Sequence, residues 1–167
     1  APAKLAERNL SGADATEIGY MRAEARFLRA LSYYHALDLF GNVPFVTEGD
    51  NVGAFLPTQI SRANLFTYVE NELKAIETEL KDARTNQYGR ADKAAAWALL
   101  SRLYLNAEVY TGTPKYGDCI TYCNKVTAVT GYALATNYRN LFLADNNNTG
   151  AGEFIFAVNF DGNKSRT

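Results

Sequence analysis

The chain of 167 residues is long enough for one domain, and its apolar share of 47% suffices for a hydrophobic core. Its 17 lysines and arginines are scattered among 18 acidic residues, and the net charge of −1 gives no field that would attract nucleic acid. No apolar run approaches the ~20 residues needed to cross a bilayer, and the first twelve residues lack the apolar segment of a targeting signal. Nucleic-acid binding and a membrane-spanning segment are therefore not expected.

The first predicted helix begins at Asp14, which serves as the N-cap, with Glu17 completing a capping box. Gly41 suits the C-terminal cap, and Pro44 prevents the helix from continuing. A long loop follows to Pro57 and is a candidate binding feature. Apolar side chains cover one stripe of the helix and extend beyond it, so we expect the helix to be covered on more than one side. The stripe holds Tyr20, Ala23, Phe27, Ala30, Leu31, Tyr34 and Leu37, widened by Met21, Ala25 and Leu28.

The second predicted helix has Ser61 as its N-cap and one buried face. Two glutamate–lysine pairs with i,i+4 spacing, Glu70 with Lys74 and Glu77 with Lys81, are expected on its exposed side. They would support the helix without entering the core.

A third helix is capped by Asp92, and its alanine-rich start lets neighbouring backbones approach closely. Residues 111–114 end this helix, and a fourth helix over about 116–130 completes a second helical hairpin. Short helical character is expected at 138–142. The chain therefore reads as two helical hairpins in series.

The phenylalanines of residues 153–160 alternate and predict a short terminal strand. A solitary strand needs a partner, which is either the segment 43–46 or sequence not included here. We therefore interpret residues 1–167 as a single helical-repeat region and as a fragment of a larger protein.

An internal repeat links the first and third helices. Its spacing is that of the first helix of a tetratricopeptide repeat, in which three residues form the wedge between hairpins, although the match is partial and the loops are irregular. Trp97 is interpreted as a core wedge rather than a sugar-stacking platform, because it lies in mid-helix. The predicted wedge residues are Phe27, Ala30 and Tyr34, matched by Trp97, Leu100 and Tyr104.

Metal, cofactor and catalytic sites are not predicted. Cys119 and Cys123 lie four residues apart on a predicted helix, which places their Cβ atoms about 6 Å apart, too far for an unstrained disulfide. We expect buried free thiols. His35 is the only histidine, so a zinc site or a catalytic Cys-His or Ser-His-Asp arrangement lacks support.

Two sets of residues leave alternatives open. Arg22, Arg26 and Arg29 follow helical spacing and could form an anion-binding strip, but pairing with neighbouring acids is the favoured interpretation. Several tyrosines at helix ends or in loops could stack on sugars or act as half-buried lids, and the sequence does not decide between these roles. These tyrosines are Tyr88, Tyr110, Tyr116, Tyr132 and Tyr138.

The residues RAEARFLRALSYYHALDLFGNVPFV, at 22–46, resemble the SusD/RagB family of outer-membrane nutrient-binding lipoproteins of Bacteroidetes-type bacteria. The resemblance continues through the second helix, DKAAAWALLSRLYLNAEVY at 92–110, the YGDCITYCNKV helix, NYRNLF and EFIFAVNF. Members of the family are much longer and begin with a lipidated cysteine, which is absent from this chain.

The resemblance implies a mainly α fold of tetratricopeptide-like hairpins with long irregular loops and a short terminal strand. It also implies a non-catalytic, cofactor-free protein at the outer-membrane surface, lipid-anchored in its full-length form. Such a protein binds a glycan, or sometimes a peptide, and delivers it to a partner, a SusC-type TonB-dependent transporter. No ligand-contacting residue is carried over from the family.

Two other functions are weighed. A freestanding tetratricopeptide-like adaptor that binds proteins is compatible with the repeat spacing alone. A glycan hydrolase would need paired carboxylates on facing elements, whereas the acidic residues here are expected at helix caps or on helix exteriors.

Overall fold

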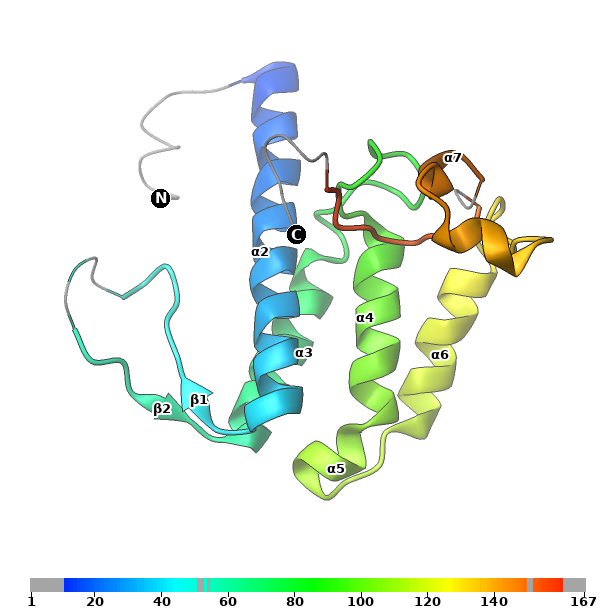
Figure 1. The fold of residues 1–167 in the computed structure, drawn as a ribbon. Coiled ribbons are helices and arrows are strands. Elements are labelled where there is room, and N and C mark those ends of the chain that lie inside the picture. The colour runs from blue at the N-terminus through cyan, green and yellow to red at the C-terminus, as the bar shows by residue number, and fades with distance from the viewer. Residues whose placement is uncertain (1–10, 51–52, 54, 150–151, 161–167) are drawn as a thin grey trace.

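The computed structural model describes residues 11–50, 53, 55–149 and 152–160. Within these ranges four longer helices stand side by side and alternate in direction (Figure 1). Helices α2 and α3 form the first hairpin, α4 and α6 form the second, and α3 also contacts α4. The mainly α fold is confirmed. The helices are α2 (Gly12–Phe40), α3 (Arg62–Ile76), α4 (Lys93–Leu105) and α6 (Tyr116–Thr127).

Helix α2 begins earlier than the sequence predicted. Its N-cap is Ser11, and Asp14 lies inside the first turn, so the predicted cap is wrong. Glu17 is not part of a capping box, because its carboxylate pairs with Arg90 at 2.9 Å and with Lys81 at 3.0 Å. The C-terminal end follows the prediction, since Gly41 has a φ of 73° and its N–H donates to the Leu37 carbonyl oxygen.

One face of α2 is buried and the opposite face is open. Met21 and Leu28 are 53% and 50% exposed, so the expectation that α2 is covered on more than one side is wrong for the described residues. The buried face consists of Ala23, Phe27, Ala30, Tyr34 and Leu37.

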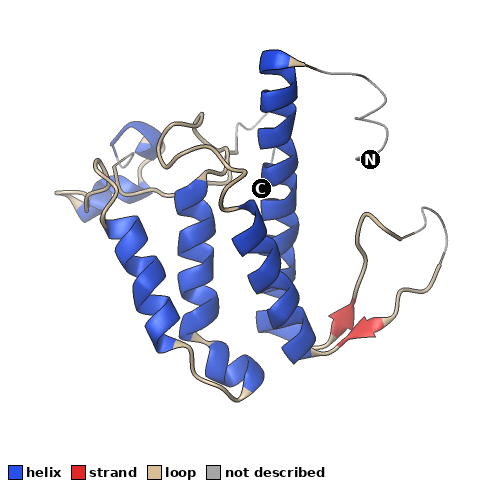
Figure 2. Cartoon of the chain, turned by 180° about the vertical axis from the view of Figure 1, so that it is seen from behind, coloured by secondary structure: helices blue, strands red, loops and turns tan. Residues whose placement is uncertain are grey.

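A two-stranded hairpin follows α2 and projects away from the helices (Figures 1 and 2). Strand β1 (Val43–Pro44) pairs antiparallel with β2 (Gln59–Ile60). The hydroxyl of Tyr33 ties the hairpin to α2 by donating to the Val46 carbonyl oxygen at 2.7 Å and accepting from the Val46 N–H at 2.8 Å. Within the segment 43–46, residues 43–44 therefore pair with 59–60, and not with the residues described at 153–160.

Helix α3 starts at the predicted cap, where the hydroxyl oxygen of Ser61 accepts from the Asn64 N–H at 3.4 Å. The pair of Glu70 and Lys74 forms as expected, at 2.9 Å, but Glu70 is buried rather than on the exposed side. Glu77 does not pair with Lys81. It faces the second hairpin, where its carboxylate meets Lys125.

The second hairpin is more segmented than predicted. Helix α4 is capped by Asp92, whose carboxylate accepts from the Ala95 N–H at 3.1 Å. The helical course breaks at Asn106 and resumes as the short α5 (Ala107–Thr111), which Gly112 ends. After α6, the expected short helical turn is present as the 3-10 helix η1 (Tyr138–Phe142), and the four-residue α7 (Asn146–Thr149) follows.

The described part of the predicted terminal strand, residues 153–160, is not a strand. Other contacts hold this segment and the residue before it: the Ala133 N–H donates to the Gly152 carbonyl oxygen at 3.0 Å, and the Ala135 N–H donates to the Glu153 carboxylate at 2.7 Å. The Phe156 ring lies edge-on to Phe27, with ring centroids 5.2 Å apart. The alternating phenylalanines therefore reflect packing on the helices and not a sheet.

The core lies between the two hairpins and draws on α2, α3, α4 and α5. Its largest fully buried side chains include Tyr104, Phe66, Leu37 and Leu65. In the described part of the chain, no helix is both long and apolar enough to cross a membrane.

Candidate functional site

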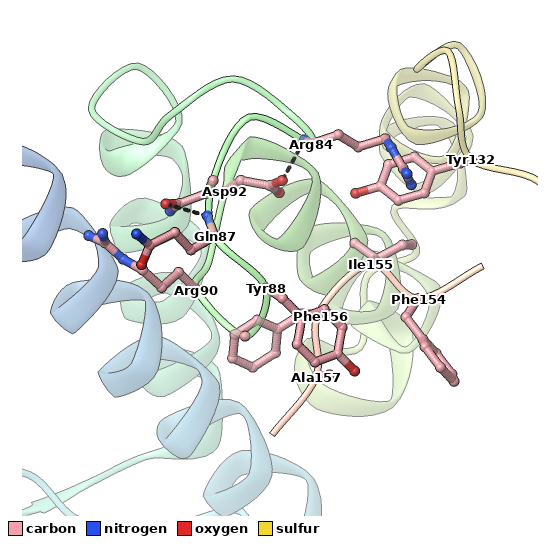
Figure 3. Close-up of a pocket in the computed structure, with 12 residues that line it drawn as sticks. Arg84, Gln87, Tyr88, Arg90, Asp92, Tyr132, Phe154, Ile155, Phe156 and Ala157 are labelled. Carbon is pink, nitrogen blue, oxygen red and sulfur yellow. Dashed lines mark hydrogen bonds between the residues drawn. The ribbon is translucent and has the colours of Figure 1, made fainter. Parts of the chain in front are cut away.

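A concave site with aromatic walls, which we call the aromatic hollow, lies at one end of the second hairpin (Figure 3). Its volume is about 190 Å³. It forms where the turn between α3 and α4 meets Tyr132 and the segment 154–157. The lining residues are Arg84, Asn86, Gln87, Tyr88, Gly89, Arg90, Asp92, Tyr132, Phe154, Ile155, Phe156 and Ala157.

The turn that forms one wall is fixed by the buried carboxylate of Asp92. One of its oxygens caps α4, and the other accepts from the Arg84 N–H at 2.7 Å (Figure 3). The backbone of Arg84 has a φ of 63°, a left-handed conformation. Asn86 adds a bond across the turn, because its side-chain amide donates to the Ala91 carbonyl oxygen at 2.9 Å. The wall is thus set by hydrogen bonds within the turn.

Arg90 fastens this turn to α2. Its guanidinium donates to Glu24 at 2.8 and 2.9 Å and to Glu17 at 2.9 Å. The hydrogen bonds that it donates to Glu24 and Glu17 hold the pKa of Arg90 above its ordinary value. Because its donors already have protein acceptors, Arg90 is a structural part of the hollow.

The side chains of Gln87 and Tyr88 also line the hollow, and they have no hydrogen-bond partner among the described residues. The guanidinium of Arg84 lies 4.9 Å from the ring centroid of Tyr132, a cation–π contact that leaves its N–H groups available. Burial raises the pKa of Tyr132 to about 12, with a contribution from the Asp92 charge, so its phenol is neutral at physiological pH.

Aromatic surface and hydrogen-bond donors therefore occur together in the hollow. Tyr88 is 51% exposed, while Phe154 and Phe156 are half-buried. Flat apolar rings beside a few polar groups suit a ligand that has both apolar faces and hydroxyl groups, such as a sugar. Asp92 is committed to its cap and Arg90 to its ion pairs, so no acid–base pair for hydrolysis is present among the lining residues.

A second, more apolar hollow of about 210 Å³ adjoins the first. Tyr132 and Ile155 line both. It extends toward the end of α6 and includes Val126, Leu134 and Glu153. Together the two hollows form an extended surface with Tyr132 at the centre.

The predicted wedge residues lie in the core and not at the aromatic hollow. Five of the six are buried, and Trp97 is half-buried. The Trp97 indole N–H donates to Glu77 at 2.9 Å, and the ammonium of Lys125 lies 5.6 Å from its ring centroid. The first triplet lies on α2 and the second on α4; they are Phe27, Ala30 and Tyr34, and Trp97, Leu100 and Tyr104.

Two of the three arginines on α2 form structural ion pairs, as the favoured interpretation predicted. Arg26 meets Glu72 at 3.0 Å, and Arg29 meets the same carboxylate at 2.8 Å and also pairs with Glu48. Arg22 is exposed and does not belong to this cluster.

The thiols are free, but they are less buried than expected. Cys119 is half-buried and Cys123 is exposed. Burial, together with the neighbouring Cys123, raises the pKa of Cys119. His35 lies on the exposed face of α2, and the described residues contain no group of three or more histidine, cysteine, aspartate or glutamate side chains arranged to hold a metal ion.

The sequence identified part of the aromatic hollow. Tyr88 and Tyr132 stand out as loop tyrosines, whereas Phe154 and Phe156 were assigned to a strand and Arg84 to none of the candidate sites. The signal that could have identified Arg84 is the tight turn at 82–92. The carboxylate of Asp92 accepts from the Arg84 N–H, so the residue that caps α4 also fixes the path of the backbone before it.

Comparison with known proteins gives a consistent group of relatives. A SusD-like family model described as "Starch-binding associating with outer membrane" matches residues 4–105. The starch-binding protein SusD of Bacteroides thetaiotaomicron is 47% identical over 147 residues, which make up 87% of this chain and 26% of that protein. The chain therefore spans about a quarter of the length of this curated relative.

Solved structures share the fold. A SusD-like carbohydrate binding protein from Bacteroides fragilis is similar with a TM-score of 0.70 and 27% identity, over 89% of this chain and 28% of that one. A SusD superfamily protein from Parabacteroides distasonis is similar with a TM-score of 0.78 and 26% identity, over 94% of this chain and 34% of that one.

Proposed function

Because the chain belongs to the SusD-like family of starch-binding proteins that associate with the outer membrane, we propose that it is the helical-repeat part of a longer surface protein that binds a glycan for uptake. The observation that carries this proposal is the 47% identity to a starch-binding protein across 87% of the chain. A starch-derived oligosaccharide is the ligand class that follows from this relative.

The arrangement of side chains supports binding without chemistry. The aromatic hollow offers the exposed ring of Tyr88 for stacking and the side chains of Arg84 and Gln87 as donors to sugar hydroxyl groups. Its acidic residue, Asp92, is occupied as a helix cap. The hollow is our candidate for a contact between this part of the protein and the glycan.

The proposal includes a location and a partner. The protein would be held at the outer-membrane surface by an N-terminal lipid, and it would hand its ligand to a TonB-dependent transporter of the SusC type. The family description, which names association with the outer membrane, supports the location. The six wedge residues would act within this part of the protein as the packing surface between hairpins, and they would not contact the ligand.

The test is direct binding to the native protein isolated from its source cells. We expect saturable binding of maltohexaose by isothermal titration calorimetry, with cellohexaose as a control of equal length and different linkage. We also expect an intact mass well above the 18.4 kDa of this chain and a lipid at the N-terminus. A folded native protein that binds no starch fragment would overturn the proposed ligand, and an unlipidated 18.4 kDa product would favour the adaptor.

A further inference from the structure

Arg84 is held in place at both its backbone and its side chain, although it lies at the surface. Its backbone has a φ of 63°, which residues other than glycine rarely adopt, and its N–H donates to Asp92 at 2.7 Å. Its guanidinium lies over the Tyr132 ring, 4.9 Å from the ring centroid (Figure 3). Gly131 leaves room for this approach, because a Cβ atom at position 131 would lie 3.1 Å from the Arg84 Nε atom. The guanidinium is therefore positioned before a ligand arrives.

The N–H groups of the Arg84 guanidinium have no acceptor among the described residues. The other arginine of the aromatic hollow, Arg90, gives its donors to Glu17 and Glu24. Asp92, the acidic residue of the hollow, binds backbone N–H groups instead of the guanidinium. Arg84 is thus a positive charge in the wall of a concave site, with its donors available to a ligand.

A carboxylate is the ligand group that this arrangement suits best. The guanidinium is planar, and its fork of N–H groups matches the two oxygens of a carboxylate, whereas a hydroxyl group offers a single oxygen. Hydrogen bonds that involve ionised groups are about twice as strong as those between neutral groups. Because the stack on Tyr132 already orders the side chain, binding costs less conformational entropy.

The rest of the aromatic hollow does not oppose a negative charge. The Asp92 carboxylate is buried at the N-terminus of α4, where backbone N–H groups and the helix dipole offset its charge. Glu153 lines the second hollow and not the first. Gln87 and Tyr88 add neutral donors, and the Tyr88 ring is exposed enough to cover the apolar face of a sugar. Charge, donors and ring surface therefore combine for a sugar that carries a carboxylate.

We infer that the aromatic hollow binds the acidic unit of a glycan, with Arg84 holding the carboxylate and Tyr88 stacking on a sugar ring. The inference rests on the proposed binding of a glycan, and it adds the chemical class of the unit that enters the hollow, a sugar acid. Starch, for which the relative is named, is neutral. A glucan oxidised to a carboxylate at one end should therefore bind more tightly than the unmodified glucan.

Two other roles of Arg84 are outcomes of the test. In a purely structural role, the cation–π contact with Tyr132 would stabilise the fold, and its loss would leave ligand preference unchanged. In an unselective anion site, Arg84 would bind inorganic phosphate as readily as a sugar acid.

The test compares glucans that differ at one end. Maltohexaonate is maltohexaose with its reducing end oxidised to a carboxylate, and maltohexaitol, with the same open-chain end reduced to an alcohol, is the neutral control. All three are titrated into the native-length protein by isothermal titration calorimetry. We expect maltohexaonate to bind about tenfold more tightly than maltohexaitol at low ionic strength, because one charge-assisted contact is added. Added salt should reduce this preference.

Variants assign the preference to the hollow. Arg84→Gln should bind maltohexaonate and maltohexaitol equally. Arg22→Gln, which removes the same charge from an exposed site on α2 outside the hollow, should keep the wild-type preference. Arg84→Lys retains the charge but not the planar fork, so its preference should be intermediate. Melting temperatures establish which variants are folded, and Arg84→Lys provides the comparison if the glutamine variant is not.

Equal affinities of the wild-type protein for maltohexaonate and maltohexaitol would overturn the inference, as would a preference that persists in Arg84→Gln. Glucuronate should displace maltohexaonate more effectively than inorganic phosphate does, and equal displacement would show an unselective anion site instead. The two proposals fail separately. Binding of maltohexaose without a preference for the acid refutes the sugar acid alone, whereas binding of maltohexaonate alone refutes the starch ligand and leaves the acidic site standing. If none of the three glucans binds, both proposals are wrong.

Discussion

The hydroxyl group of Tyr104 donates a hydrogen bond of 2.8 Å to Glu70, so that α4 of the second hairpin is joined to α3 of the first inside the core. Lys74 and Lys115 each approach the same carboxylate at 2.9 Å. Seven residues further along the chain, at the C-cap of α3, the carboxylate of Glu77 accepts a hydrogen bond from the Trp97 indole N–H of α4. Because α3 and α4 run in opposite directions, Tyr104, near the end of α4, bonds to Glu70, and Trp97, near its start, bonds to Glu77. The two hydrogen bonds therefore link the hairpins at two successive points.

Removing the Tyr104 hydroxyl tests the contribution of the Tyr104–Glu70 hydrogen bond. Tyr104→Phe keeps the buried ring but leaves Glu70 with its two lysines alone, so we expect a loss of about 1 to 2 kcal/mol in the free energy of unfolding. Urea denaturation measures this loss. Tyr138→Phe is the matched control, since Tyr138 is 71% exposed and its hydroxyl has no hydrogen-bond partner among the described residues. Equal stability of both variants would show that the Tyr104–Glu70 hydrogen bond does not stabilise the fold.

Three ion-paired glutamates, one buried and two half-buried, predict a loss of stability in acid. Burial alone would raise the pKa values of Glu70, Glu72 and Glu77, but hydrogen bonds from cationic partners outweigh burial and hold all three below the ordinary value of 4.5. In the unfolded chain these groups take up protons near pH 4.5, before the folded state does. Their stabilisation is therefore complete above that pH and is lost as the pH falls through the folded values.

Urea midpoints between pH 7 and pH 3 measure this dependence. We expect the midpoint to fall steeply below about pH 4.5, and Glu70→Gln should flatten the curve because one of the three titrating groups is gone. A wild-type midpoint that stays constant down to pH 3 would show that the ion pairs do not stabilise the fold.

The sequence predicted the parts of the fold that depend on neighbouring residues. The caps at Ser61 and Asp92, the end at Gly41 and the pair of Glu70 with Lys74 all follow from local spacing. The partners that Glu70 and Glu77 find in the second hairpin could not be predicted, because these contacts depend on how α4 and α6 pack against α3. Glu77 was assigned to Lys81 by spacing, although Lys125 of α6 reaches it in the fold.

Two predictions are wrong for the same reason: the terminal strand and the covering of α2 on more than one side. A pattern of apolar residues does not identify the element that packs against them. The alternating phenylalanines of 153–160 have the period of a strand, yet Phe156 packs on Phe27 without a sheet. The second stripe of α2 predicted a covering element that the described residues do not supply. Tyr88 and Tyr132 were visible as loop tyrosines, but the aromatic hollow depends on bringing the end of the chain beside the turn at 84–92, which no local signal predicts.

The two cysteines should differ in reactivity. Cys123 is exposed, whereas burial raises the pKa of Cys119 and reduces access to it. We expect iodoacetamide to modify Cys123 faster, by about fivefold or more at pH 7.5, because the thiolate is the reactive form. Peptide mass spectrometry over a time course measures both rates, and Cys123→Ser isolates that of Cys119. Equal rates would contradict the difference in environment.

The aromatic hollow makes a prediction about Tyr88. If its exposed ring stacks on a sugar, Tyr88→Ala should weaken maltohexaose binding about tenfold, which corresponds to the 1 to 2 kcal/mol expected of one aromatic contact. The melting temperature should stay close to that of the wild type, because the side chain is half exposed. Tyr138→Ala, an exposed tyrosine outside the hollow, should leave binding unchanged. Unaltered binding in Tyr88→Ala would move the sugar contact elsewhere.

Trp97 separates a packing role from a binding role. Trp97→Ala removes a large ring from the space between α3, α4 and α6, and we expect a loss of about 3 kcal/mol in the free energy of unfolding. Trp97→Phe keeps most of the ring and loses the bond to Glu77, so its cost should be smaller, at about 1 kcal/mol. Both variants should keep the wild-type affinity for maltohexaose wherever they remain folded. A variant that retained its stability and lost its affinity would identify Trp97 as a ligand platform, because a wedge residue affects binding only through the fold.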